Sequence, residues 1–132
     1  MVIAISAIIA LQKRWGINMV AAVAMVQSVD EIWRREIGER LRLLGKAVGI
    51  THDQEIADEL GVGKTNWGNW RRGDIMLPPA IARQLKEKYG AAFDWLYLGD
   101  DSNNTARLNE RLREVIRAEG PRNITLRKSN NG

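Results

Sequence analysis

The chain of 132 residues contains no cysteine and only one histidine, His52. The lack of cysteine excludes disulfides, thiolate metal ligands and a cysteine nucleophile, and it fits a cytoplasmic protein. His52 stands at an expected helix start, where a solvated side chain is a better interpretation than a catalytic base. No grouping of histidine, cysteine or paired carboxylates is evident, so the sequence predicts neither an enzyme nor a bound cofactor.

The chain also lacks an apolar run long enough to cross a membrane. Two runs, 2–11 and 17–26, are separated by Gln12-Lys13-Arg14, whereas a spanning helix needs about 20 apolar residues. A secretory signal carries its positive charge before the apolar run, not after it. We interpret residues 1–28 as an apolar N-terminal extension. Met19 and Met25 are alternative translation starts, so residues 1–24 can be interpreted as not belonging to the native protein. We expect these residues to contribute nothing to the fold or to DNA binding.

The net charge of +4 is unevenly distributed. Residues 29–103 carry 11 basic and 13 acidic side chains, whereas residues 104–132 carry seven basic and three acidic ones. The central region is therefore mildly acidic, which argues against binding of nucleic acid through bulk charge alone. Within it, however, residues 62–72 have three basic side chains and no acid, whereas residues 53–59 have four acids.

Hydrophobic spacing predicts an all-α fold without strands or repeats. A first helix, from Asp30 to about Val48, has apolar residues at helical spacing, and Thr51 and Gln54 have the spacing of a capping box for a second helix. Later helices are expected at 80–89, after Pro78-Pro79, at 93–98 and at 105–119, with a hydrophilic linker at 100–104 and a basic tail after Gly120. The residues predicted for the core of the first helix are Ile32, Trp33, Ile37, Leu41 and Leu44.

Residues 53–73 have the pattern of a helix, a tight turn and a second helix. Ile56, Ala57 and Leu60 form a narrow apolar stripe. Gly61 stands where the first helix must end in a left-handed conformation. Trp67 and Trp70 give the second helix its buried face and, like Trp33 and Trp95, are better explained by core packing than by stacking on bases. At about 100° per residue, the opposite face presents Thr65, Gly68, Asn69 and Arg72, with Lys64 and Asn66 on its flanks.

These residues resemble the XRE, or lambda-repressor-like, family, and especially its small phage-repressor-type members. The resemblance depends on the pattern A57-x3-G61-V62-x2-T65-x4-W70-x2-G73, followed by Pro78-Pro79-Ala80 and the segment Asp94–Gly99, DWLYLG. It implies a bundle of about five helices that binds specific DNA sequences, usually as a dimer, and controls transcription. Trp67, Gly63 and Arg71 depart from the usual residues of the family.

The sequence thus predicts a DNA-binding regulator, of repressor type, that places a recognition helix at about 64–72 in the major groove. The candidate DNA contacts are Gln54, Lys64, Thr65, Asn66, Asn69 and Arg72. The expected partners are double-stranded DNA and a second copy of the chain, with no membrane, metal or small-molecule substrate. A protein-interaction module or an antitoxin-like partner-binding protein on the same fold stays open. The stripe Leu108–Ile116 either packs on the bundle or forms a dimer surface.

Overall fold

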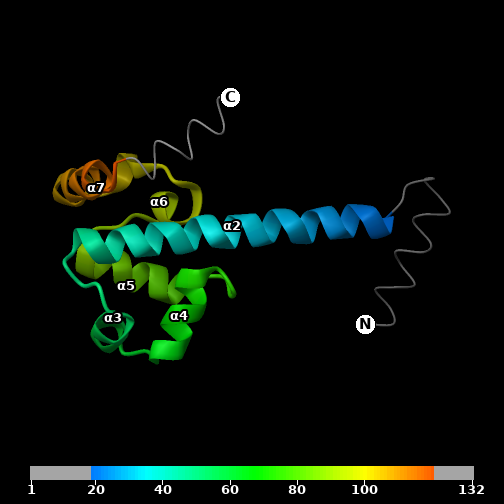
Figure 1. Ribbon diagram of the computed structural model, residues 1–132, viewed down its shortest axis with the longest axis horizontal. Coiled ribbons are helices and arrows are strands. Elements are labelled where there is room, and N and C mark those ends of the chain that lie inside the picture. Colours follow the sequence, from blue (N-terminus) through cyan, green and yellow to red (C-terminus); the bar gives the residue numbers. More distant parts are fainter. Residues whose placement is uncertain (1–18, 121–132) are drawn as a thin grey trace. The chain divides into compact units, whose positions relative to one another are not determined.

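The computed structural model describes residues 19–120, and all regular secondary structure in this range is helical (Figure 1). The all-α prediction is confirmed. The chain divides into two compact units, residues 1–33 and 34–132. The predictions for residues 1–18 and for the basic tail at 121–132 lie outside the described residues. The elements are α2 (Met19–Ala47), α3 (Asp53–Leu60), α4 (Lys64–Arg72), α5 (Pro79–Tyr89), α6 (Phe93–Leu98), the 3₁₀ helix η1 (Asp101–Asn103) and α7 (Ala106–Glu119).

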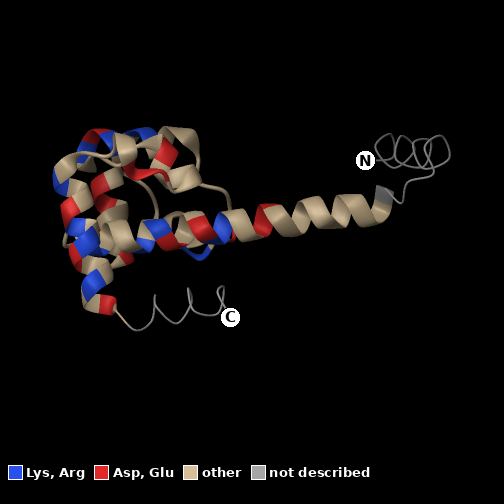
Figure 2. Cartoon of the chain, turned by 90° about the horizontal axis from the view of Figure 1, so that it is seen from above, with Lys and Arg blue, Asp and Glu red and all other residues tan. Residues whose placement is uncertain are grey.

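The first described helix, α2, is longer than the sequence pattern indicates. It begins at Met19, so the predicted start at Asp30 is wrong. No proline or glycine interrupts residues 19–37, and nothing in this stretch ends a helix. Its first eleven residues carry no charge (Figure 2). Within residues 19–120, no helix has both the length and the apolar character needed to cross a membrane.

The buried stripe of α2 starts later than expected. Ile37, Leu41 and Leu44 are almost fully buried, but Ile32 is 54% exposed and Trp33 is 36% exposed. The prediction that Ile32 and Trp33 belong to the core is therefore wrong. Apolar spacing identifies the face of a helix, but it does not determine how far along the helix its partners pack.

The hydrophobic core of residues 34–120 contains side chains from the C-terminal part of α2 and from α3, α4, α5, α6 and α7. In Figure 1, α3 and α4 lie below the C-terminal part of α2, and α6 and α7 lie above it. Leu108 and Leu112 of α7 belong to the same buried cluster, and Val115 packs against it, so this side of α7 covers the bundle. The largest fully buried side chains are Ile37, Leu41, Leu44, Ile56, Trp67, Leu77, Leu85 and Leu96.

A close backbone approach holds α2 against the end of α4. Gly38 is buried in the middle of α2, and a Cβ at this position would lie 2.2 Å from the carbonyl oxygen of Arg71. On the preceding turn, Nε of Arg34 donates a hydrogen bond of 3.1 Å to the carbonyl of Gly73. A glycine inside a helix costs about 1 kcal/mol relative to alanine. Here the missing side chain is what allows the two helices to pack at this distance.

The segment predicted as a linker, residues 100–104, is folded against the bundle. It forms η1 and ends at Asn104, which is buried. Oδ1 of Asn104 accepts a 2.7 Å hydrogen bond from the backbone N–H of Ala92, and its Nδ2 donates to Oδ1 of Asn109. Thr105 then caps α7 with its hydroxyl. The bounds predicted for the last three α-helices agree with the structure to within one residue.

Candidate nucleic-acid interface

The helix, turn and helix predicted between Asp53 and Gly73 are confirmed. Gly61 ends α3 in the left-handed conformation, with φ at 69°, and its N–H bonds back to the last turn of the helix. The N–H of Val62 closes the turn with a 3.0 Å bond to the carbonyl of Ala57. Only glycine adopts this backbone geometry at little cost. The chain therefore reverses over three residues and brings α4 against α3.

Two tryptophans fix the rotation of α4 about its axis. Trp67 is 1% exposed and Trp70 is 7% exposed, and their rings meet edge to face with centroids 6.4 Å apart. Because both side chains point into the core, the face on the other side of α4 is turned to solvent. Lys64, Thr65 and Asn66 are all exposed there.

The structure places the other two predicted contacts of α4 together. Asn69 is half-buried, and its Oδ1 accepts a 2.8 Å hydrogen bond from Nη2 of Arg72. Arg72 is exposed and also pairs with Asp74 at 3.2 Å. These two residues thus form a connected polar group near the end of α4.

Gly68 faces away from the core, as the helical projection predicts, but it is not exposed to solvent. It is buried, because the side chain of Arg72 folds over it. A Cβ at Gly68 would lie 2.7 Å from Nη1 of Arg72. The neighbouring group is the mobile end of a side chain rather than backbone, so a larger residue at position 68 can be accommodated.

The capping box predicted for α3 is absent. The N-cap of α3 is His52, and no side chain makes a capping hydrogen bond. With His52 at the N-cap, the third helical position is Glu55, so Thr51 and Gln54 are each one residue too early to form the box. Gln54 is exposed in the first turn, where its Nε2 donates to Asp58 at 2.8 Å.

An ion pair that the sequence pattern did not indicate joins the start of α3 to the end of α4. The guanidinium of Arg71 donates two hydrogen bonds of 2.8 Å to the two carboxylate oxygens of Asp53. Hydrogen bonding to Arg71 lowers the pKa of Asp53, and the same contact raises the pKa of Arg71. Two planar groups bound in this way fix each other's direction as well as their distance.

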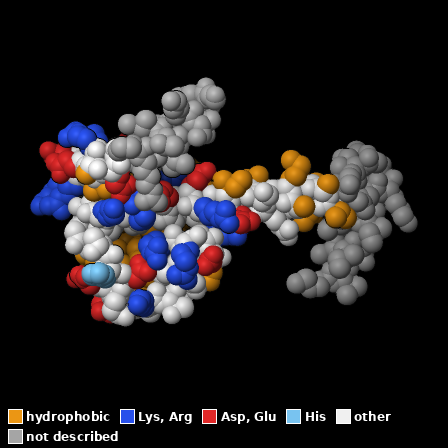
Figure 3. Space-filling view, viewed as in Figure 1, with side chains coloured by type: hydrophobic (Ala, Val, Ile, Leu, Met, Phe, Trp, Pro, Cys, Tyr) orange, Lys and Arg blue, Asp and Glu red, His pale blue; other side chains and the backbone are white. Residues whose placement is uncertain are grey.

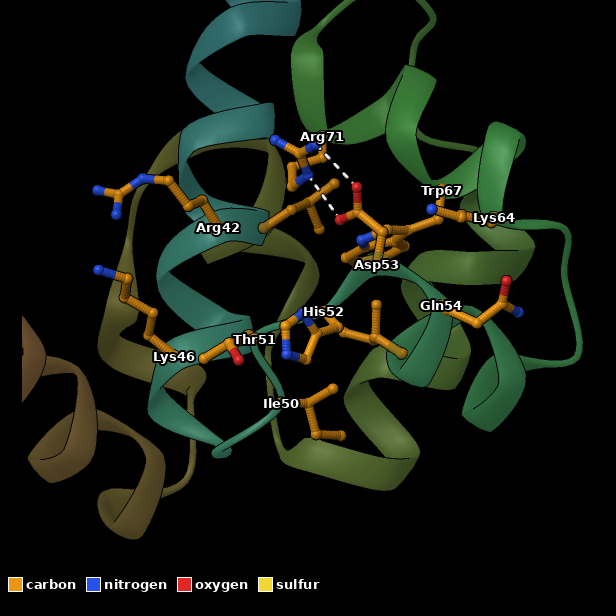
Figure 4. Close-up of a pocket in the computed structure, with 13 residues that line it drawn as sticks. Arg42, Lys46, Ile50, Thr51, His52, Asp53, Gln54, Lys64, Trp67 and Arg71 are labelled. Carbon is orange, nitrogen blue, oxygen red and sulfur yellow. Dashed lines mark hydrogen bonds and ion pairs between the residues drawn. The ribbon is translucent and has the colours of Figure 1, made fainter.

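A hollow of about 560 Å³ opens between α2, α3 and α4 (Figure 4). Four cations and one carboxylate, that of Asp53, line it, and Lys and Arg side chains gather on this face in the space-filling view, with the single histidine at its edge (Figure 3). In the described part of the chain, no group of three histidine, aspartate or glutamate side chains could hold a metal ion. The four cations are Arg42, Lys46, Lys64 and Arg71.

Among the residues around this hollow, the sequence pattern predicts DNA contacts at Lys64 and Gln54 but not at Arg42 and Lys46. The latter two project from the last turns of α2, outside the helix-turn-helix pattern. Their spacing of four residues places them on one face of the helix. The spacing is a signal in the sequence that Arg42 and Lys46 act together, but it does not indicate which element their face of α2 packs against.

A family model, the bacteriophage CI repressor helix-turn-helix domain, matches residues 39–104, which include α3 to α6 and the C-terminal turns of α2. No curated protein and no solved structure matches the chain. The matched region covers half of the sequence and contains the turn at Gly61 and the exposed face of α4. The chain belongs to the family of the bacteriophage CI repressor helix-turn-helix domain.

Proposed function

We propose that this protein is a sequence-specific DNA-binding regulator of transcription that inserts α4 into the major groove. The observation that carries the proposal is the exposed polar first turn of α4, held in place by two buried tryptophans behind it. The major groove admits an α-helix, and base edges there are recognised by amide, hydroxyl and cationic side chains. Family membership supports the same assignment.

Lys64, Thr65 and Asn66 are the strongest candidates for base contacts, because they are exposed in the first turn of α4. In helix-turn-helix proteins the N-terminal residues of the second helix contact the bases. Lysine suits guanine O6 and N7, and asparagine suits adenine N6 and N7. The side chains of Asn69 and Arg72 are hydrogen-bonded to one another, so we expect them to contact DNA together.

The hollow beside α3 suits the phosphate backbone. Its lining combines four cations with the N-terminal end of α3, which no side chain caps. Uncapped N–H groups and the helix dipole favour an anion at this end. Gln54, in the first turn of α3, is the candidate phosphate contact there, while α3 lies across the backbone. Phosphate contacts of this kind fix the register of the recognition helix and carry no sequence information themselves.

We further propose that the protein acts as a repressor and binds DNA as a homodimer. Two copies would place their recognition helices in successive major grooves, so the operator would contain two half-sites separated by about 10 base pairs or a multiple of that spacing. Light scattering of the protein with and without the selected duplex measures the number of copies bound.

Selection from a random pool of duplexes tests the function without knowledge of the operator. The full chain is immobilised, bound duplexes are amplified through several rounds, and the enriched sequence is measured by fluorescence anisotropy at two salt concentrations. We expect an enriched motif and an affinity for it at least about 10³-fold above that for unrelated duplex.

Three substitutions then locate the recognition surface. Lys64→Ala and Asn66→Ala should each weaken binding to the selected motif by about 1–3 kcal/mol, with little effect on unrelated DNA. Arg113→Ala, which removes an exposed cation from α7, is the control for loss of one positive charge. If both α4 variants bind the motif as tightly as the parent, α4 is not the recognition helix. If no duplex is enriched, a protein-binding role for this fold takes precedence.

A further inference from the structure

The last residue of α7 binds two cations of α2 at once. Glu119 accepts hydrogen bonds from Nη1 and Nη2 of Arg42, at 2.7 and 2.9 Å, and from Nζ of Lys46 at 2.8 Å. Its side chain is only 11% exposed. The hydrogen bond to Arg42, which has the larger effect, and the one to Lys46 lower the pKa of Glu119 to about 2. The carboxylate is therefore charged at physiological pH, as pairing with both cations requires.

These two cations also line the hollow to which we assign the phosphate backbone. Figure 4 shows that the side chains of Arg42 and Lys46 point away from the ion pair of Arg71 with Asp53 and toward a common side. Arg42 is further held by Glu39, through a bond from Nε of 2.9 Å. Half of the cations around the hollow are thus paired with acids that do not line it.

A carboxylate and a phosphate are interchangeable partners for these groups. Arginine binds either one through two parallel N–H bonds, and lysine binds either one as a point charge. When a DNA phosphate reaches Arg42 and Lys46, the carboxylate of Glu119 therefore already accepts their hydrogen bonds. The phosphate must displace this carboxylate or remain outside the contact.

The contact comes from a part of the chain beyond the matched domain. The family model ends at residue 104, whereas Glu119 closes α7. Leu108 and Leu112 anchor α7 in the core, so the helix can stay in place when the ion pairs at its last residue break. Glu119 is in this way held beside Arg42 and Lys46, whose charges it neutralises.

We propose that Glu119 is an intramolecular competitor for DNA phosphate at Arg42 and Lys46, so that DNA binding exchanges its carboxylate for a phosphate oxygen and releases the end of α7. This inference rests on the proposed function. It makes Arg42 and Lys46 additional phosphate contacts and gives α7 control over sequence-independent affinity, while the recognition face of α4 keeps its specificity.

The test uses the full chain and a fluorescein-labelled 20-base-pair duplex of mixed sequence at low salt. Glu119→Gln keeps the size of the side chain but removes its charge. It should bind the duplex about fivefold more tightly, because a DNA phosphate no longer has to displace a charged carboxylate from Arg42 and Lys46. The gain should shrink as salt is added, because the intramolecular pair is itself screened. Glu114→Gln, which removes an exposed acid of the same helix, is the matched control and should change affinity much less.

A second set of variants tests whether the gain in DNA affinity depends on Arg42 and Lys46. In a chain that already carries Arg42→Gln and Lys46→Gln, the further change Glu119→Gln should give no increase in affinity. Hydrogen exchange at the end of α7 should also become faster when the duplex binds to the parent. Glu119→Asp, which keeps the charge on a shorter side chain, should give an intermediate gain and provides the measurement if Glu119→Gln does not fold.

The outcomes separate this inference from the function on which it rests. If the parent binds DNA and Lys64→Ala weakens specific binding, but Glu119→Gln behaves like Glu114→Gln, the competition is refuted and the function stands. An undiminished gain in the background without Arg42 and Lys46 also refutes it, because the effect then comes from net charge. If the parent binds neither the selected duplex nor the mixed one, the proposed function itself fails.

Discussion

Replacement of Gly38 by alanine should destabilise the domain, although the same change stabilises most helices. Alanine in place of glycine inside a helix gains about 1 kcal/mol. At Gly38, however, the new Cβ would lie 2.2 Å from the carbonyl oxygen of Arg71 and 2.9 Å from its carbonyl carbon. A carbon and an oxygen normally approach no closer than about 3.3 Å, so α2 and the end of α4 would have to separate by about 1 Å.

The magnitude follows from what obstructs the new methyl group. Overpacking of a core costs typically about 1–3 kcal/mol, and the upper end applies here because backbone cannot rotate away as a side chain can. With the helical gain of about 1 kcal/mol subtracted, Gly38→Ala should lower the free energy of unfolding by about 2 kcal/mol. For a unit of this size, the melting temperature should fall by about 8–16 °C.

Gly68→Ala is the matched control for Gly38→Ala. Gly68 also lies inside a helix and is buried, but its Cβ would meet only the end of the Arg72 side chain. This variant should keep the stability of the parent or exceed it by up to about 1 kcal/mol. Thermal and urea unfolding followed by circular dichroism measure both variants. A Gly38→Ala protein as stable as the parent would show that α2 and α4 do not approach as closely as the structure has them.

Three further predictions concern contacts between distant parts of the chain. Asn104→Ala leaves the buried N–H of Ala92 without its 2.7 Å acceptor and should cost about 1–3 kcal/mol in urea unfolding; a neutral result would mean that the loop repacks. Tyr97→Phe removes a 2.7 Å hydrogen bond to the carbonyl of Leu77 and should cost about 1 kcal/mol, visible as a lower urea midpoint at unchanged slope. The pKa of Glu119 is lowered from 4.5 to about 2, so its contribution to stability should be complete above pH 4.5 and be lost as the pH falls toward 2. In acid titrations followed by circular dichroism, the difference between parent and Glu119→Gln should close over that range, and a constant difference would contradict the ion pair.

Much of the fold could be predicted because it depends on local signals. Gly61 and Gly90 end their helices in left-handed conformations, and proline opens α5, so helix bounds could be placed from single residues. The spacing of Trp67 and Trp70 gave the buried face of α4. Two of the errors have local causes as well. Helix α2 has no stop signal before Asp30, and the capping box of α3 failed because the N-cap falls on His52 and not on Thr51.

The candidate site could be predicted only in part. Periodicity placed Thr65 on the exposed side of α4 and Lys64 and Asn66 on its flanks, and all three are exposed in the structure. It also placed Gly68 on the side away from the core, but Gly68 is buried because the side chain of Arg72 covers that position. Helical projection shows the direction in which a residue points, but it does not show which neighbouring side chain folds across it.

The sequence by itself determined the helices, the turn at Gly61 and the buried face of α4, because each of these depends on residues within a few positions of one another. Only the tertiary structure decided that Gly38 meets the carbonyl of Arg71, that Asp53 and Arg71 form an ion pair, and that Glu119 binds α2. Arg42 and Glu119 are 77 positions apart in the chain. A pairing of that kind leaves no periodic trace in either helix, because it depends on the crossing of two helices whose positions are set by the core between them.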